Sequence, residues 1–507
     1  MLPETSFRDL PDEMLENILS YLSFEDRKSA LQVCQRLSTV KPFDFATVQL
    51  VVDFARNPGQ EATYFRILLA SNRPYKHLVL YFGYDSGKYD LLVEIFQHFS
   101  AKLETLKLIP HNFIPVKLKL FAQVAALGSN LRHLHIDACN FDYSRDEMDF
   151  PVMRNLEELY LENNLLSLVP SMKDITPNIT RLHMQISYYS EEPQLFLRHF
   201  SSSLVELEIW FLSEDYFMTI CEMQFPSLKK INFYCVDLEI DHIGSLEKIE
   251  LINSFFKEIP LLTEVTLRCN IDDRVIQKLC RSCVNIQFLC VSMDYFLQES
   301  FLAVCELKQL QHLRIEEAAI NVPTEMYLPI KSLQILTLYS VRIVHEDKFN
   351  EFIRDAFPNL IAIEMLHLNT RKNESRSFQL HTKITQDMSS IQRLVFSEPG
   401  TNVMVNSLLE FCETSGSLEL RLRCWNIVDL FPGDETPELI RVQKLNLDVP
   451  MIAPSVMHKL ISSMRELRQL EVALSDYCTP KVIDTLREQF PRCHVVAKRK
   501  VPIEEPL

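Results

Sequence analysis

Apolar positions recur along this chain in a three-point pattern. One apolar residue is followed after two variable positions by a second, and after one more by a third, as in Leu228, Ile231 and Phe233. The alternation between the second and third is typical of a short strand with one buried face. Clear copies begin at Leu131, Leu156, Leu204, Leu228, Leu262, Ile286, Leu310, Leu333, Leu360 and Leu467. Fainter copies begin at Phe45, Tyr75, Leu103, Ile179, Leu246, Ile391 and Val442, with a distorted copy near Leu418.

The spacing of these copies predicts the architecture. Their starts fall about 25 residues apart, within the range of leucine-rich repeats. Proline precedes the first apolar position by two residues at Pro177, Pro226 and Pro358, where it directs the chain into the strand. One strand with its return segment cannot bury its own apolar side, so neighbours must stack. We therefore predict an α/β fold, a curved solenoid with parallel strands on the concave face and helices and loops on the convex face.

Several return segments have a pattern of their own. Helices are expected at 271–282 and 346–356, and a final helix near 480–490 with a strand at His494–Ala497 should cap the array. The copy at Leu246 divides the interval 228–262 into two short spacings. We expect loops rather than helices there.

The N-terminal segment 10–37 has a different pattern, that of two short amphipathic helices. The first carries Leu15, Ile18, Leu19 and Leu22 at helical spacing. The second carries Ala30, Val33, Cys34 and Leu37 at the same spacing. About 40 residues rarely bury enough surface to be stable alone. The two stripes must be covered either by the following domain or by another protein, and the second option would make this segment a docking module.

These residues resemble the F-box, through Leu10-Pro11, then Leu15, Ile18 and Leu22, then Asp26 and Val33-Cys34. The resemblance implies docking onto the adaptor subunit of an SCF-type (cullin-RING) ubiquitin ligase, and through the adaptor onto a cullin. The residues expected to bind the adaptor are Leu10, Pro11, Leu15, Ile18, Leu19, Leu22, Val33 and Cys34. Residues 42–495 resemble the leucine-rich repeats that follow many F-boxes. We expect an F-box module over 1–41 and a degenerate repeat solenoid with a C-terminal cap over 42–507.

The composition of the chain limits the classes of partner that it can bind. The formal net charge of the 507 residues is −16, which disfavours nucleic acid because phosphate contacts need clustered Lys and Arg. The N-terminus lacks the pattern of a signal peptide, and no apolar run is long enough for a membrane span. We therefore expect a cytoplasmic or nuclear protein without membrane contact, whose 13 cysteines are free and mostly buried.

Candidate chemistry is sparse. Cys280 and Cys283 form the only C-x-x-C, and no second pair follows at the spacing of a zinc site. His133, His135 and His183 fall on predicted strands, but the last two would lie too far apart to share an ion directly. The chain lacks the phosphate-binding, nucleophile-elbow and zinc-protease motifs. We expect no catalytic residue, no metal and no cofactor.

The concave face is where a protein partner should bind. In the middle repeats its outward residues are unusually apolar, at Phe288, Cys290, Ile335, Ile361, Ala362 and Val395. Exposed apolar patches often mark interfaces. We hypothesise that 286–395 contacts a substrate protein through Phe288, Ile335, Ile361 and Val395. The alternative is a strand register displaced by one residue, which would bury these side chains.

Together these features predict a non-catalytic receptor subunit. Its N-terminal helices would bind the ligase adaptor, and its repeats would hold a substrate for ubiquitination and proteasomal degradation. Its mechanism would be proximity, since binding raises the effective concentration of substrate lysines. An alternative is a non-degradative scaffold or inhibitor. Leu37 supports it, because it stands where the family usually has Trp.

Overall fold

The computed structural model shows two compact units, Met1–Leu204 (unit 1) and Val205–Leu507 (unit 2). Each unit is described separately. The described residues are 14–15, 19, 29–30, 49–53, 66–70, 75–82, 89–110, 115–117, 126, 128, 130–137, 140–142, 152–161, 176–185, 192–210, 214–234, 246–269, 271–321, 328–343, 352–366, 391–402, 418–426, 442–449, 452–475 and 478–498. The predicted domain boundary between residues 41 and 42 lies outside them and stays a prediction.

Unit 1 contains a parallel sheet in which each strand pairs with the next main strand along the chain. The order is β1 (Gln49–Asp53), β2 (His77–Phe82), β3 (Thr105–Pro110), β5 (His133–Ile136), β7 (Glu158–Leu161) and β8 (Arg181–Gln185). Helices α5 (Tyr89–Phe99) and α8 (Glu192–Phe200) belong to return segments. Two short strands, β4 (Pro115–Lys117) and β6 (Asn140–Asp142), form a separate parallel pair.

Unit 2 repeats the same arrangement over more strands. Its sheet runs through β9 (Glu206–Trp210), β10 (Lys230–Tyr234), β11 (Glu264–Arg268), β12 (Phe288–Ser292), β14 (His312–Glu316), β16 (Ile335–Tyr339), β18 (Ala362–Leu366), β19 (Arg393–Asn402), β20 (Leu418–Asn426), β21 (Val442–Asp448), β22 (Gln469–Ala473) and β23 (His494–Lys498). A minor parallel sheet contains β13 (Tyr295–Phe296), β15 (Ala319–Ile320) and β17 (Arg342–Ile343).

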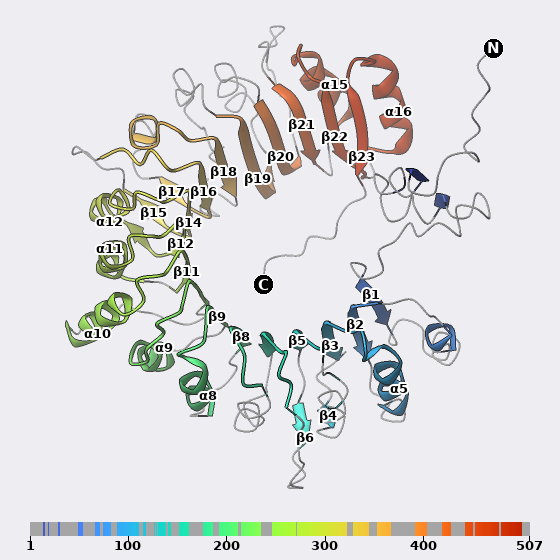
Figure 1. Ribbon diagram of the computed structural model, residues 1–507. Helices are drawn as coiled ribbons and strands as arrows, with labels where there is room; N and C mark the ends of the chain where they lie inside the picture. Colours follow the sequence, from blue (N-terminus) through green and yellow to red (C-terminus); the bar gives the residue numbers. More distant parts are fainter. Residues whose placement is uncertain are drawn as a thin grey trace. The chain divides into compact units, whose positions relative to one another are not determined.

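The helices of unit 2 lie on one side of its strands. They are α9 (Glu214–Cys221), α10 (Leu246–Lys257), α11 (Asp273–Ser282), α12 (Gln298–Val304), α15 (Pro454–Ser462) and α16 (Pro480–Gln489). Within this unit the strands follow a curved row with the helices on its outer side (Figure 1). We call the opposite, strand-lined side the inner face of the unit. The predicted class, a parallel-strand repeat solenoid, is confirmed.

The three-point pattern forms the core. All three apolar residues of each clear copy are buried, and Leu228, Ile231 and Phe233 are fully enclosed. Burying one such aliphatic or aromatic side chain contributes about 1.5–3 kcal/mol, which explains why the pattern fixes the register. Since Leu289, Leu336 and Leu394 are buried, the displaced register considered for the middle repeats is excluded.

Four of the corners that precede strands use asparagine. Nδ2 of Asn130 donates to the Ala101 carbonyl at 2.8 Å, and Nδ2 of Asn178 donates to the Arg154 carbonyl at 2.7 Å. In unit 2, Asn285 donates to Pro260 and Asn359 to Lys331 in the same way, at 3.2 and 2.8 Å. Each asparagine therefore ties its own repeat to the carbonyl of the repeat before it.

The return segments agree with prediction except in one interval. The helices expected at 271–282 and 480–490 are α11 and α16, and residues 352–356 are helical. Asp272 begins α11 by accepting a hydrogen bond from the Arg274 backbone N–H at 2.7 Å. The loops expected in 228–262 are wrong, because Leu246 begins helix α10. Ile249, Ile252 and Phe256 lie at helical spacing and are buried, so this return packs as a helix.

Cysteine packing follows the expectation only in part. Of the seven described free cysteines, six are buried and Cys493 is partly exposed. Cys269 differs from the expected free state, because it is disulfide-bonded.

Candidate functional site

The predicted adaptor-binding residues are described only at two positions. Leu15 and Leu19 are helical and have exposed fractions of 1% and 2%. Their side chains are therefore covered by other residues of this chain. Contact of these two with an adaptor stays a prediction and would require the helix to open. Leu10, Pro11, Ile18, Leu22, Val33 and Cys34 lie outside the described residues.

Of the three described helical residues Met14, Leu15 and Leu19, Met14 is the exposed one. Its exposed fraction is 51%, while the adjacent Leu15 is buried. Because successive helical residues are rotated by about 100°, Met14 faces away from the side that Leu15 and Leu19 bury. The helical stripe recognised in the sequence does not include Met14, because such a stripe collects apolar residues that face a common, buried side.

The predicted substrate-binding residues lie on or beside the inner face of unit 2. Phe288 and Ile335 begin their strands in the same cross-strand row, with His312 between them. Ile361 comes one residue before β18, and Val395 lies on β19. All four are partly exposed, whereas Cys290 and Ala362 are buried. Of the six outward residues that the sequence predicted, four are therefore partly exposed and two are buried, and their contact with a substrate stays a prediction.

A second row of this face was missed. The strand residues that follow the third apolar position include Trp210, Tyr234, Arg268, Glu316 and Tyr339. The rings of Trp210 and Tyr234 stack 3.9 Å apart at an interplanar angle of 4°. The Arg268 guanidinium lies 5.0 Å from the centroid of the Tyr234 ring, within the range of a cation–π contact. A simple signal could have identified this row. Because side chains alternate along a strand, the residue directly after the third apolar position faces the inner side, as the variable position between the second and third apolar residues does.

Glu316 holds two arginines at the centre of this row. Nη2 of Arg268 donates to Oε1 of Glu316 at 2.9 Å, and Nε lies 2.6 Å from Oε2 without hydrogen-bond alignment. Nε of Arg314 donates to the same Oε1, and its guanidinium lies 5.5 Å from the Tyr339 ring centroid. Burial opposes the charge on Arg268, but the Glu316 hydrogen bond and charge raise its pKa overall. Arg268 therefore stays cationic, and Glu316 fixes the positions of both guanidinium groups.

Next to these arginines, a chain of polar contacts crosses four strands, β14, β16, β18 and β19. Thr337 Oγ1 lies 3.0 Å from Nε2 of His312 and donates to Oε2 of Glu364 at 3.1 Å. Nη2 of Arg393 donates to Oε1 of the same carboxylate at 2.9 Å. Burial, the largest cause, lowers the pKa of His312.

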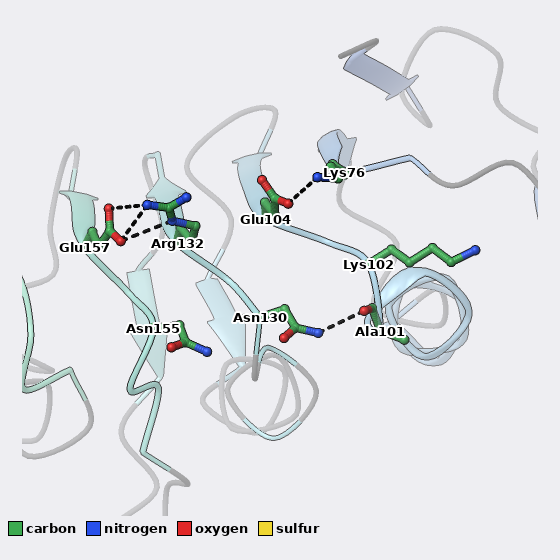
Figure 2. A pocket seen from close by; sticks show the side chains of 8 residues that line it. All are labelled: Lys76, Ala101, Lys102, Glu104, Asn130, Arg132, Asn155 and Glu157. Atoms are coloured by element: carbon green, nitrogen blue, oxygen red, sulfur yellow. Dashed lines mark hydrogen bonds and ion pairs between the residues drawn. The ribbon is translucent and has the colours of Figure 1, made fainter. Parts of the chain in front are cut away.

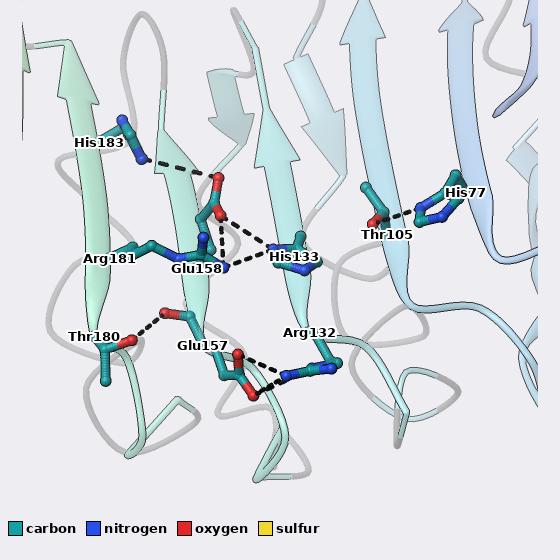
Figure 3. A network of polar contacts seen from close by, with 9 residues as sticks. All are labelled: His77, Thr105, Arg132, His133, Glu157, Glu158, Thr180, Arg181 and His183. Atoms are coloured by element: carbon teal, nitrogen blue, oxygen red, sulfur yellow. Dashed lines mark hydrogen bonds and ion pairs between the residues drawn. The ribbon is translucent and has the colours of Figure 1, made fainter. Parts of the chain in front are cut away.

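Unit 1 carries a comparable network around Glu158 (Figure 3). Oε2 of Glu158 lies 3.0 Å from both Nδ1 of His133 and Nη2 of Arg181. Oε1 lies 3.8 Å from Nε2 of His183. Glu158 therefore joins β5, β7 and β8, and two of the histidines singled out from the sequence contact a carboxylate.

His135 has a different environment from its neighbours. Its ring stacks on Tyr160 with centroids 3.9 Å apart, and Tyr160 stacks in turn on His183 at 5.5 Å. Burial, and after it the charges of Lys107 and His183, lower the pKa of His135 to about 3. The imidazole is therefore neutral near pH 7. No group of three His, Cys, Asp or Glu residues in the described ranges could hold a metal ion.

An open pocket of ≈ 630 Å³ lies where strands β2, β3, β5 and β7 of unit 1 begin (Figure 2). Lys76 contacts Glu104 at 2.6 Å, and this hydrogen bond holds the Glu104 pKa below its usual value. Arg132 donates to both carboxylate oxygens of Glu157. The charged groups that line the pocket thus largely neutralise one another. The lining residues are Lys76, Ala101, Lys102, Glu104, Asn130, Arg132, Asn155 and Glu157.

The C-x-x-C pair is part of the packing. Cys280 and Cys283 are both buried, and the Cys283 thiol donates to the Phe256 carbonyl at 3.3 Å. Burial raises the pKa of Cys283 to about 12, so this thiol is neither a good nucleophile nor a thiolate ligand at neutral pH.

The fold and these surfaces define a class: a parallel-strand repeat solenoid with a broad polar and aromatic inner face. A family model described as F-box-like matches residues 7–40. Among solved structures, the "Crystal structure of TLR13-ssRNA13 complex" matches 84% of this chain and 81% of that chain, at 13% identity and a TM-score of 0.35. A likeness this low carries no conclusion about ligand or function. Curated protein sequences give no significant match.

Proposed function

We propose that this chain is the substrate-recognition subunit of an SCF-type ubiquitin ligase. The observation that carries the proposal is the F-box-like match over residues 7–40, because that domain implies binding to an SCF adaptor and thereby a cullin. The repeats, which we take to be of the leucine-rich type, offer a second surface for a substrate protein. Catalysis would belong to other subunits, so the chain itself is proposed to be non-catalytic.

The adaptor contact is proposed to involve the exposed side of the first helix. Met14 is the described apolar residue on that side, and Ile18 follows it at the i, i+4 spacing that places two side chains on one face. Leu15 and Leu19 would instead hold the module together. This assignment separates substitutions that remove a contact from substitutions that unfold the helix.

Co-purification tests the proposal. Full-length wild type should recover the adaptor, and Met14→Glu should reduce recovery at least about tenfold, because it places a charge in an apolar contact. Leu328→Glu is the matched control, since Leu328 is also exposed, with an exposed fraction of 66%, but lies in unit 2. Failure of the wild type to recover any adaptor would refute the ligase function.

The non-degradative scaffold stays the second candidate. Two observations favour it: Leu37 stands where the family usually has Trp, and the chain covers Leu15 and Leu19 itself. Deletion of residues 1–40 distinguishes the two candidates in cells. A ligase subunit should lose the ability to shorten the half-life of proteins bound by its repeats, whereas a scaffold should leave their half-lives unchanged.

A further inference from the structure

The strongest feature outside the proposed adaptor contact is the arginine pair of unit 2. Arg268 on β11 and Arg314 on β14 both contact Glu316, which has a side-chain exposure of 5%. The two arginines retain exposures of 24% and 23%. One side of each guanidinium is therefore held by the buried carboxylate, while part of it still reaches the inner face.

The cluster carries a local excess of one positive charge. Arg268 and Arg314 share the single carboxylate of Glu316. Neighbouring charges have partners of their own: Lys230 pairs with Glu264 at 3.2 Å, and Arg393 with Glu364 at 2.9 Å. Glu208 accepts hydrogen bonds from Trp210 and Asn232. These donors are neutral, so Glu208 keeps its negative charge, and the excess of one positive charge is counted for Arg268, Arg314 and Glu316 alone.

We propose that Arg268 and Arg314 bind a carboxylate on an acidic segment of the protein recruited by the repeats. This inference rests on the proposed function and specifies the chemistry of its substrate. An arginine has five N–H donors, and Glu316 engages only some of them, so a second carboxylate can be bound through charge-assisted hydrogen bonds. A single carboxylate matches the excess of one charge. A phosphate dianion beside Glu316 would leave an uncompensated negative charge.

The apolar patch adds a second requirement. Phe288 and Ile335 lie in the first row of the inner face, and His312 between them packs edge-on against Phe288 at 4.8 Å. Glu316 is four residues further along the strand than His312, a distance of roughly 13 Å. An extended segment running along the strands would therefore present an apolar side chain and a carboxylate about four residues apart.

Peptide binding tests this directly. The probe is a fluorescein-labelled Gly/Ser peptide with one leucine and, four residues later, one glutamate; its matched partners carry glutamine or phosphoserine instead. Full-length wild type should bind the glutamate peptide at least about tenfold more tightly than the glutamine peptide, because charge-assisted hydrogen bonds are the stronger kind. Raised salt should weaken the binding of the glutamate peptide but leave that of the neutral glutamine side chain little changed.

Variants locate the site. Arg268→Gln and Arg314→Gln should each remove the preference for glutamate, whereas Arg281→Gln, on the opposite, helical side, should leave it intact. The comparison of peptides on the wild type needs no variant, so misfolding of an arginine variant cannot hide the answer. Equal affinity for glutamate and glutamine peptides would overturn the proposal, as would stronger binding of the phosphoserine peptide or no binding of the glutamate peptide at millimolar concentration.

The assay contains no adaptor, so the two proposals fail separately. Loss of the glutamate preference with intact adaptor recovery would refute the carboxylate site alone. Peptide binding without adaptor recovery would refute the ligase function and leave an acidic-segment binding solenoid.

Discussion

At the scale of single residues, polar side chains on the inner faces act by sharing partners across strands. Glu316 serves two arginines, and Glu158 serves His133 and Arg181 at 3.0 Å each. Partners in such a cluster are far apart in sequence, as Arg268 and Glu316 are, and they meet only because parallel register aligns their strands. The sequence therefore shows these residues but not which of them will be in contact. For this reason the sequence analysis missed the arginine pair.

His135 gives a residue-scale prediction about pH. Its folded-state pKa of about 3 lies below the unfolded value of about 6.5, so the unfolded chain takes up the proton first as pH falls. Between these values the residue lowers the free energy of unfolding by at most about 1.4 kcal/mol per pH unit. Urea unfolding at pH 7 and pH 5 should show a smaller loss for His135→Gln than for wild type.

The control for that experiment is His199→Gln, because His199 is exposed on α8. It should lose stability between pH 7 and pH 5 as wild type does. An unchanged pH dependence in His135→Gln would mean that partial burial does not hold the pKa of the His135 imidazole low.

At the scale of elements, the strands of the three-point pattern were predictable, whereas helix α10 was mistaken for a strand and a loop. The first two marks of the repeat pattern are three residues apart, a spacing that strands of this motif share with helices. Leu246 and Ile249 satisfied it although they belong to α10. The signal that separates a helix from a strand comes later in the sequence, where Ile252 and Phe256 continue at helical spacing. In the structure Leu251, which the pattern takes as the third apolar residue, is only half-buried. A window of one motif was too short to tell the two apart.

The asparagine corners give an element-scale prediction. Asn359→Asp keeps the shape of the side chain but removes the N–H that donates to the Lys331 carbonyl at 2.8 Å. We expect thermal or urea unfolding to show a loss of about 1 kcal/mol, the usual net contribution of one hydrogen bond. Gln311→Glu makes the same amide-to-acid change at an exposed position and should leave stability within about 0.5 kcal/mol of wild type.

At the scale of the molecule, the described units are arrays in which each repeat covers the core of its neighbour. The fold class followed from period and patterning alone, because stacking requires the same buried positions in each repeat. The placement of the proposed adaptor and substrate surfaces did not follow. This placement depends on which apolar side chains stay exposed to solvent after folding. Met14 and Leu15 are adjacent in sequence, yet Met14 is exposed and Leu15 is buried. None of the described helices is long and apolar enough to cross a membrane.

Removal of the last repeat of unit 2 tests the role of its cap. Truncation after Leu474 deletes α16 and β23, which place Ile483, Leu486 and Val495 over the end of the core. The exposed apolar end should lower the melting temperature and promote aggregation, measured by thermal unfolding and light scattering. Truncation after Lys498 keeps both elements and should behave as wild type; identical behaviour of the shorter chain would show that the cap is dispensable.

The sequential pairing of strands has a consequence for synthesis. Within each unit every main strand pairs with the one made just before it, so the required contacts join segments only a few tens of residues apart. A newly translated repeat can dock onto the finished edge as soon as it leaves the ribosome, without waiting for a distant partner. Growth of the solenoid can therefore keep pace with translation, one repeat at a time.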